Sequence, residues 1–487
     1  MELKGKAYLR RKLDGYRTGV QTRYKYYSME KFDNTDGITI PAQIRDKYKA
    51  VLGWATKAVD SLADRLIFRE FANDNFKIND IFQYNNPDIF FDSAILSALI
   101  GSCCFIYVSK DEEGMPRLQV IEASNATGII DPITNLLTEG YAVLKRDDYD
   151  KPLLEAYFTP NETIFYPKGE EPYSIENQTG IPLLVPIIHR PDASRPFGRS
   201  RITKSGISYQ KTAQRTIERS EITAEFYSFP QKYALGVSQD AESVESLKAT
   251  ISSFIMFTKD DDGDKPSVGQ FTTASMTPFV EQLKMAASGF AGETGLTMDD
   301  LGFSSDNPSS VEAIKASHEN LRLAGKAAHR SIGSGLLNVA YVAVCLRDDF
   351  RYMRKEFMKA EVKWEPLFEA DASTLTMLGD GAIKVNQVLP GYITAETIRD
   401  LTGIKGNMEA KPVQETEEQK VKVTDDASDK QKNRIISTYE ITSLLSNYQK
   451  GVLSKENGIA LLASTGMSEK EAESMLNNTK VEGKDNE

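Results

Sequence analysis

The chain has 487 residues, of which 40% are hydrophobic and 26% charged, so it is long enough for about three domains of ordinary size. This composition excludes a small disulfide-stapled fold and a wholly disordered chain. Lysine and arginine number 59 against 70 aspartates and glutamates, so the formal net charge is 59 − 70 = −11. Because nonspecific DNA binding depends on basic groups that neutralise phosphates, this charge argues against a general DNA-gripping surface.

The cysteines and the apolar runs indicate a reducing compartment and no membrane span. Cys103, Cys104 and Cys345 have no metal-ligand spacing and are expected to be reduced packing residues. The longest clean apolar run, 336–346, is too short to cross a bilayer, and the amino-terminus is polar and charged. We therefore expect no targeting segment and no membrane contact.

The first 200 residues predict one α+β domain. Apolar residues at helical spacing predict a helix around 51–62, and a second helix is predicted over 87–100. The apolar runs 103–108 and 118–121, separated by a turn-rich segment, predict a β-hairpin. Further short strands are expected up to about His189.

A single helix is predicted over 204–229, where Pro230 ends it. One face is apolar or small, formed by Tyr209, Ala213, Ile217, Ser220 and Ala224. Opposite this face, two charged stripes lie side by side: basic Lys211, Arg215 and Arg219, and acidic Glu218, Glu221 and Glu225. Two interpretations stay open. The stripes are either a solvated surface with local ion pairs, or the contact between copies in a ring, where each basic stripe faces a neighbour's acidic stripe.

The following segment, 231–277, predicts a small α/β insertion with strands over 232–237, 254–258 and 268–272 and a helix over 241–252. Its acidic turn, 260–264, does not have the ligand spacing of an EF-hand loop. We therefore interpret it as a solvated hairpin turn.

A second helix is predicted from Pro278 to about Gly292, with Gly289, Gly292 and Gly295 allowing it to bend. The loop that follows, 298–310, is rich in turn and capping residues, and Ser309 or Ser310 is expected to cap the next helix. That helix carries an apolar seam from 314 to 346, and its glycines at 325, 333 and 335 permit kinks or close contacts.

The C-terminal region contains a weak repeat, in which 391–401 matches 451–461 at an offset of sixty. Thr394 and Ser454 are the expected helix caps. Between the repeats, 409–432 is polar and charge-dense and is predicted to be a linker. Amphipathic helices are predicted over 435–449 and 455–463.

Catalytic and cofactor signatures are sparse, and we expect neither an enzyme nor a cofactor. The chain has no phosphate-loop, dinucleotide-loop, HExxH or CxxC motif. Its three histidines are His189, His318 and His329, and the last two are too far apart along a helix to share one metal ion. Asp299 and Asp300 keep one rival interpretation open, a metal-dependent nucleic-acid hydrolase.

Two sequence runs resemble tailed-bacteriophage portal proteins. GLTMDDLGFSSDNPSSVEAIKASHENL, at 295–321, resembles their tunnel loop and long tunnel helix, which follow a second stem helix. RPFGRSRITKSGISYQKTAQRTIERSE, at 195–221, resembles the approach to their first stem helix. The order of helix, α/β insertion, helix, loop and long helix is also that of the portal core. The specific motifs lie within about 195–325, and the layout extends over most of 40–400.

The resemblance implies an α+β portal fold with these parts: wing (1–203), first stem helix (204–230), clip (231–277), second stem helix (278–296), tunnel loop (297–310), long kinked tunnel helix and wing return (311–370), and helical crown (371–487) with the polar linker 409–432. A ring of twelve copies is expected at one capsid vertex of the virion, assembled in the host cytoplasm. Double-stranded DNA would pass through this ring when the large terminase subunit packages it, and again when it is ejected. The other implied partners are the major capsid and scaffold proteins, with which the ring nucleates head assembly, and a head-tail connector (adaptor) protein.

The net charge agrees with such a channel. Twelve copies at −11 carry about −132 formal charges, and an acidic channel repels phosphates and lets a duplex slide. Channel and tunnel-loop candidates are Glu281, Lys284, Asp299, Asp300, Ser304, Ser305, Asp306 and Asn307. Clip residues expected to dock the partner are Lys259, Asp260, Asp261, Asp262, Asp264 and Lys265. A virion ring adaptor without DNA passage is the second rival interpretation.

Overall fold

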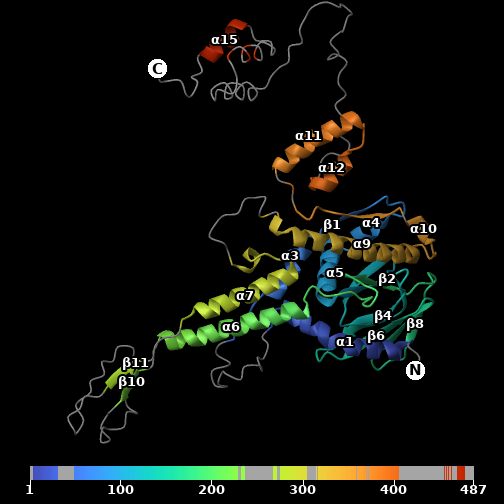
Figure 1. The fold of residues 1–487 in the computed structure, drawn as a ribbon. Coiled ribbons are helices and arrows are strands. Elements are labelled where there is room, and N and C mark those ends of the chain that lie inside the picture. The colour runs from blue at the N-terminus through green and yellow to red at the C-terminus, as the bar shows by residue number, and fades with distance from the viewer. Residues whose placement is uncertain are drawn as a thin grey trace, which may run out of the picture. The chain divides into compact units, whose positions relative to one another are not determined.

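The computed structural model describes residues 4–30, 49–228, 232–235, 267–270, 275–303, 314, 316–357, 359–368, 370, 372–404, 455, 457, 459, 462 and 469–477. It divides into two units, Met1–Met408 and Glu409–Glu487. Figure 1 shows the ribbon. The predicted helices 241–252 and 435–449, the strand 254–258, the caps Ser309, Ser310 and Ser454, the acidic turn 260–264 and the linker 409–432 lie outside the described residues.

Two antiparallel sheets form much of the first unit. The smaller has the order β3-β2-β9, with β2 (Cys103–Lys110) between β3 (Pro116–Glu122) and β9 (Leu184–Ile188). Val120 and Val185 both lie opposite Ile106, so the predicted hairpin and its register are established. The larger sheet is a meander of β4 (Ala126–Ile130), β5 (Leu137–Arg146), β6 (Pro152–Phe158), β7 (Glu162–Pro167) and β8 (Tyr173–Glu176).

Six of the described helices share one large hydrophobic core with these sheets (Figure 1). They are α1 (Lys6–Tyr27), α3 (Trp54–Ala63), α4 (Ile78–Gln83), α5 (Pro87–Gly101), α9 (Glu319–Arg347) and α10 (Arg354–Phe357). The C-terminal half of α9 is almost entirely buried. A β-carbon at Gly335 would lie 3.0 Å from the Cα of Ile187, so glycine there lets α9 approach β9 closely. The predicted mixed helix-and-sheet fold is confirmed.

The predicted long helix is interrupted by a turn near its start. Ile314, Ala316 and Ser317 are helical, but a turn at His318 separates them from α9, which begins at Glu319. After α9, β12 (Glu361–Trp364) pairs antiparallel with β1 (Phe68–Ala72) and returns the chain to the N-terminal part of the unit.

The two other predicted long helices are α6 (Lys204–Ser228) and α7 (Thr277–Thr294), which lie side by side (Figure 1). Between α6 and α7, the described residues form two strands, β10 (Lys232–Leu235) and β11 (Ser267–Gln270), which pair antiparallel with each other. The predicted buried face of α6 is partly wrong. Ala213 is buried as expected, but Tyr209 is 37% exposed, and Gln210, Thr216 and Glu218 are buried instead.

The remaining helices are α11 (Ala372–Val388) and α12 (Ala395–Thr402) in the first unit and α15 (Glu469–Asn477) in the second. The Thr394 side chain accepts a hydrogen bond from the Thr397 amide, which confirms Thr394 as the cap of α12. In the second unit, Lys455 and Glu473 form an ion pair at 3.3 Å.

The cysteines are buried free thiols, as expected for packing residues. Burial raises the pKa of the Cys103 thiol to about 12. Among the helices that the structure describes, none combines the length and apolar character needed to span a bilayer.

Candidate functional site

The candidate site is built on the helix pair α6 and α7, the segment 50–55 that runs along α6, and the turn 297–303 that follows α7. Three polar side chains on α6, Gln210, Gln214 and Glu218, are spaced four residues apart and share one face. They bind the backbone of the segment before and at the start of α3, with partners Ala50, Leu52 and Ala55.

We call the three side chains Gln210, Gln214 and Glu218 the polar ladder. Gln210 is held at both ends: its Nε2 donates to the Leu52 carbonyl at 2.6 Å, and its Oε1 accepts from the Ala55 amide at 2.9 Å. Glu218 Oε1 accepts a hydrogen bond from the Ala50 amide at 3.2 Å. Because Gln210, Glu218 and Ala55 are buried, losing these bonds would leave polar groups unpaired away from water.

Arg201 joins three elements immediately before α6. Its Nε donates to the Ala58 carbonyl of α3 at 3.1 Å, and its Nη2 donates to the carbonyl of Thr294, the last residue of α7. A cation suits this position because the carbonyl end of a helix carries partial negative charge. The side chain is almost fully buried, and this burial lowers its pKa to about 10. Arg201 therefore ties the base of the helix pair to α3.

A small apolar cluster fills the space between α3, α6 and α7. Trp54 and Phe290 are its aromatic members, with ring centroids 5.4 Å apart. The other buried members are Ala58, Ala213, Ala286, Ala287 and Leu296. The alanines allow the helices to approach closely.

The turn after α7 is held by three reciprocal hydrogen bonds between Thr297 and Asp300. The Thr297 amide and hydroxyl donate to Asp300 Oδ2 at 2.8 and 2.9 Å, and the Asp300 amide donates to Thr297 Oγ1 at 3.1 Å. His318 Nε2 lies 3.5 Å from the same carboxylate oxygen. Asp300 therefore connects the residues on the two sides of the segment 304–313.

The electrostatics of Asp300 follow from these contacts. Burial alone would raise the pKa of its carboxyl group, but the hydrogen bonds from Thr297 and the proximity of His318 outweigh burial, so the pKa lies below its ordinary value. The carboxylate is consequently charged at neutral pH and bound within its own turn.

The remaining channel candidates are placed as follows. Glu281 and Lys284 are exposed on α7 and lie 3.9 Å apart, and Asp299 is exposed beside Asp300. Ser304, Ser305, Asp306 and Asn307 lie outside the described residues, as do the clip candidates Lys259, Asp260, Asp261, Asp262, Asp264 and Lys265.

On α6, the prediction that both charged stripes are exposed is wrong for one residue. Lys211, Arg219 and Glu221 are exposed and Arg215 is half-buried. Glu218 is only 6% exposed, because it bonds the segment along α6 rather than facing away from it. The side chain of Glu225 is outside the described residues.

Metal-binding chemistry has little support in the described part of the chain. No group of three or more His, Cys, Asp or Glu side chains there could hold a metal ion. His329 stacks on Trp364, with ring centroids 4.6 Å apart, and burial lowers its pKa to about 4. His189 binds the Arg199 carbonyl through Nδ1 at 2.7 Å.

Sequence reasoning missed two groups of residues at this site. The hydrophobic pattern did not single out Arg201 or Gln210, because a buried polar group with a backbone partner looks like a solvated one in the sequence. The Thr-x-x-Asp spacing of Thr297 and Asp300 is a capping signal that could have identified the turn.

Comparison with known proteins identifies the family. A family model described as phage portal protein, SPP1 Gp6-like, matches residues 8–422. The chain therefore belongs to the phage portal protein family, whose members are structural proteins of bacteriophage virions, and the resemblance seen in the two sequence runs is confirmed.

Two relatives are portal proteins of mycobacteriophages. The chain is 27% identical over 323 residues to the portal protein of Mycobacterium phage L5, covering 61% of this chain and 65% of the relative. It is 26% identical over 329 residues to that of Mycobacterium phage D29, covering 62% and 66%. The chain thus spans just under two thirds of the length of each relative.

The solved structures that the chain matches come from gene transfer agent (GTA) particles. One is the neck of a native GTA particle computed with C12 symmetry, with a TM-score of 0.40 and 12% identity, covering 78% of this chain and 98% of that chain. Another is the virion of a native GTA particle, with a TM-score of 0.38 and 11% identity, covering 80% and 100%.

Proposed function

We propose that this chain is a portal subunit that assembles into a ring of twelve copies at one vertex of a phage capsid. The observation that carries the proposal is the family match over residues 8–422. In this proposal, residues 1–203 form the wing, α6 and α7 the stem, 231–277 the clip, 297–310 the tunnel loop, 311–370 the tunnel helix and wing return, and 371–487 the crown.

The structure supports a stem that is firmly mounted on the wing. Arg201 binds the last carbonyl of α7, and the polar ladder binds the segment that enters α3, so both stem helices are attached at their wing-side ends. Such a mount suits a subunit that guides DNA through a ring, because it fixes the proposed stem relative to the proposed wing.

Double-stranded DNA is the proposed substrate of the channel. The exposed carboxylates of Glu281 and Asp299, together with exposed Lys284, are proposed to line it with the loop residues 304–307. Net negative charge keeps phosphates from binding tightly, which lowers the barrier to sliding. Asp300 has a different proposed role, since its carboxylate is bound to Thr297 and positions the base of the loop.

The partners follow from this role. The large terminase subunit would drive DNA through the ring during packaging, the major capsid and scaffold proteins would surround it during head assembly, and a head-tail connector protein would bind the clip at 259–265. The proposed location is the portal vertex of the virion, after assembly in the host cytoplasm.

A packaging assay tests the DNA-passage role. Replacing Ser304, Ser305, Asp306 and Asn307 together by alanine should reduce the amount of DNA packaged or retained, while capsids still assemble around the ring. Normal packaging and retention by the quadruple variant would contradict a role for the loop. A parallel nuclease assay with Mg²⁺ tests the rival interpretation, and metal-stimulated DNA cleavage by the purified chain would favour the hydrolase.

A further inference from the structure

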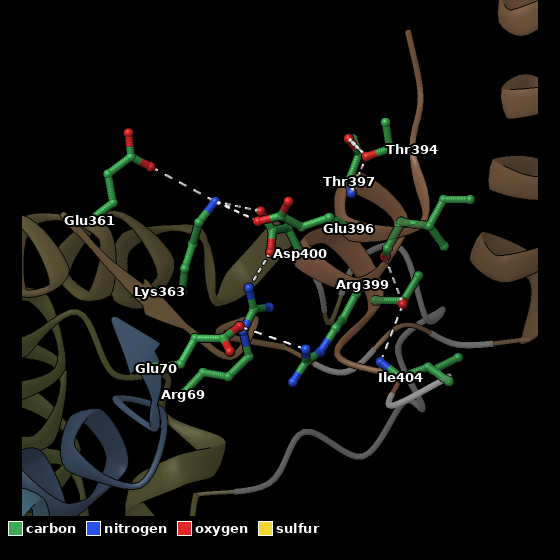
Figure 2. Close-up of polar contacts among 12 residues, drawn as sticks. Arg69, Glu70, Glu361, Lys363, Thr394, Glu396, Thr397, Arg399, Asp400 and Ile404 are labelled. Atoms are coloured by element: carbon green, nitrogen blue, oxygen red, sulfur yellow. Dashed lines mark hydrogen bonds and ion pairs between the residues drawn. The ribbon is translucent and has the colours of Figure 1, made fainter. Parts of the chain in front are cut away.

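Helix α12 is attached to the β1–β12 sheet by charged side chains (Figure 2). Asp400 is central: its Oδ1 accepts from Arg69 of β1, and its Oδ2 lies 3.0 Å from Lys363 Nζ of β12. The other ion pairs between the helix and the sheet are Glu396–Lys363 at 3.7 Å and Arg399–Glu70 at 3.6 Å.

The apolar residues of α12 do not take part in this attachment. All three of them, Ala395, Ile398 and Leu401, are exposed, Ile398 by 37% and Leu401 by 55%. Thr402 is the single buried residue of the helix. A surface helix ordinarily turns its apolar stripe toward the core and its charges toward water, so the orientation of α12 is the reverse of the usual one.

Arg69 makes the attachment dependent on Asp400. Its side chain is only 3% exposed and pairs with Glu70 of its own strand and with Asp400 of the helix. A buried cation that loses an acidic partner is strongly destabilised, because the remaining contacts no longer offset its loss of hydration. Burial alone would raise the pKa of Asp400, but the hydrogen bonds from Arg69 and Lys363 outweigh burial and lower it, so the helix presents a charged carboxylate.

The chain near Asp400 also follows the sheet closely. Gly403 ends α12 with a positive φ of 73°, and a β-carbon there would lie 3.1 Å from Pro366 Cδ, just beyond β12. On the other side of the helix, the Asn386 side chain of α11 binds both backbone groups of Ile393. The contacts of α12 with the sheet and of α11 with the loop before α12 therefore connect both helices to β1–β12.

We propose that this ionic cluster is a charge-based latch, which holds α11 and α12 against the β1–β12 sheet and can open while the rest of the first unit stays folded. The cluster comprises Arg69, Glu70, Glu361, Lys363, Glu396, Arg399 and Asp400. On α12, the apolar surface that opening can uncover is limited to the covered parts of Ile398 and Leu401, which are already 37% and 55% exposed. The proposal goes beyond the portal function and does not depend on ring formation.

Two physical properties distinguish a latch of this kind from ordinary packing. Attraction between partly exposed charges is screened by salt, whereas apolar packing is not weakened by it. Once released, an eight-residue helix is too short to be stable in water, because isolated helices below about 12–15 residues are marginal. Release should therefore appear as loss of amide protection in α12.

Hydrogen exchange on the full-length chain tests the latch. Raising NaCl from about 50 mM to about 500 mM shortens the screening length roughly threefold, and exchange in 395–402 should accelerate several-fold, while peptides from α9 keep their protection. Asp400→Asn should produce the same acceleration at low salt, and Asp400→Glu should restore protection in part. Glu319→Gln, which breaks an ion pair with Arg322 on α9, is the matched control and should leave 395–402 unchanged.

Three results would contradict the latch. Exchange in 395–402 that is independent of salt would overturn the latch, as would protection of α12 in Asp400→Asn equal to that of the unaltered chain. Simultaneous loss of protection in α9 would show that α12 is an integral part of the core. If Asp400→Asn fails to fold, the salt series on the unaltered chain still decides.

Discussion

The ring of Tyr209 on α6 lies directly over Gly289 of α7: a β-carbon added to Gly289 would be 2.4 Å from Tyr209 Cε1. The helix α7 continues through Gly289 and Gly292 to Thr294, and Gly295 follows as its cap. Gly289 is therefore a point of close contact between the two helices.

Substitution at this contact should separate steric from helix-propensity effects. Gly289→Ala forces Tyr209 or α7 to shift, and we expect a loss of about 1–3 kcal/mol in the free energy of unfolding. Gly292→Ala is the control, since a β-carbon there meets nothing within 4 Å and alanine favours a helix by about 1 kcal/mol. Urea unfolding measures both. Equal effects of the two substitutions would contradict the contact.

Arg201 should be needed for the mounting of α6 and α7 on α3. Arg201→Met removes the donors to two carbonyls and keeps much of the apolar stem, so the unfolding free energy should fall by about 2–4 kcal/mol, since each unpaired buried group costs about 1–3 kcal/mol. Arg201→Lys should recover only part of this, because lysine cannot reproduce the geometry of the guanidinium group. If Arg201→Met leaves the unfolding free energy unchanged, α3, α6 and α7 hold together without Arg201.

The pH dependence of the turn after α7 follows from Asp300. Its pKa is lower in the folded chain than in the unfolded chain, so its contribution to stability is present above the ordinary carboxyl range and is lost as the pH falls through the depressed folded value. Asp300→Asn should therefore lower stability at pH 7 by about 1 kcal/mol, the typical loss for a capping carboxylate, and flatten the decline below about pH 4.

Asp299→Asn is the matched control for this measurement, because it removes the exposed neighbouring carboxylate. Thermal unfolding of both variants between pH 7 and pH 3 makes the comparison. An acid profile of Asp300→Asn identical to that of the unaltered chain would mean that the contacts with Thr297 and His318 add nothing to the fold.

The charged stripes of α6 give a prediction about assembly rather than folding. Arg219→Glu should weaken association between copies, and Glu221→Arg in the same chain should partly restore it, if exposed basic and acidic residues of neighbouring stems face each other. Glu218→Ala should instead lower the stability of the single chain, since the Ala50 amide loses the acceptor that the buried Glu218 provides. Sedimentation measures association between copies, and denaturation measures the stability of the single chain. If Arg219→Glu and Glu221→Arg each assemble normally, the stripes are a solvated surface.

Helix and strand periodicity predicted much of this fold because it reports burial directly. The bounds of α6 were predicted to within one residue, since Pro230 cannot continue the helix, and the β2–β3 hairpin followed from two apolar runs around a turn. The same periodicity placed Glu218 on the wrong side, because its partner is a backbone amide 168 residues earlier in the chain.

The candidate site was less predictable for a related reason. Asp300 was assigned to the channel as a charged loop residue, although its spacing from Thr297 is a capping signal, and in the folded turn its carboxylate accepts hydrogen bonds from Thr297. The reversed orientation of α12 was also not predictable, because it depends on Arg69 and Lys363, which lie on strands far away in the sequence. Long-range polar contacts have no period, whereas apolar faces do.

Electron microscopy of the purified full-length chain tests the portal assignment most directly. The expected result is a ring with twelvefold rotational symmetry and an axial channel wide enough for a B-form duplex, with α6 and α7 arranged around that channel. Particles that remain single subunits, or rings closed at their axis, would contradict the account.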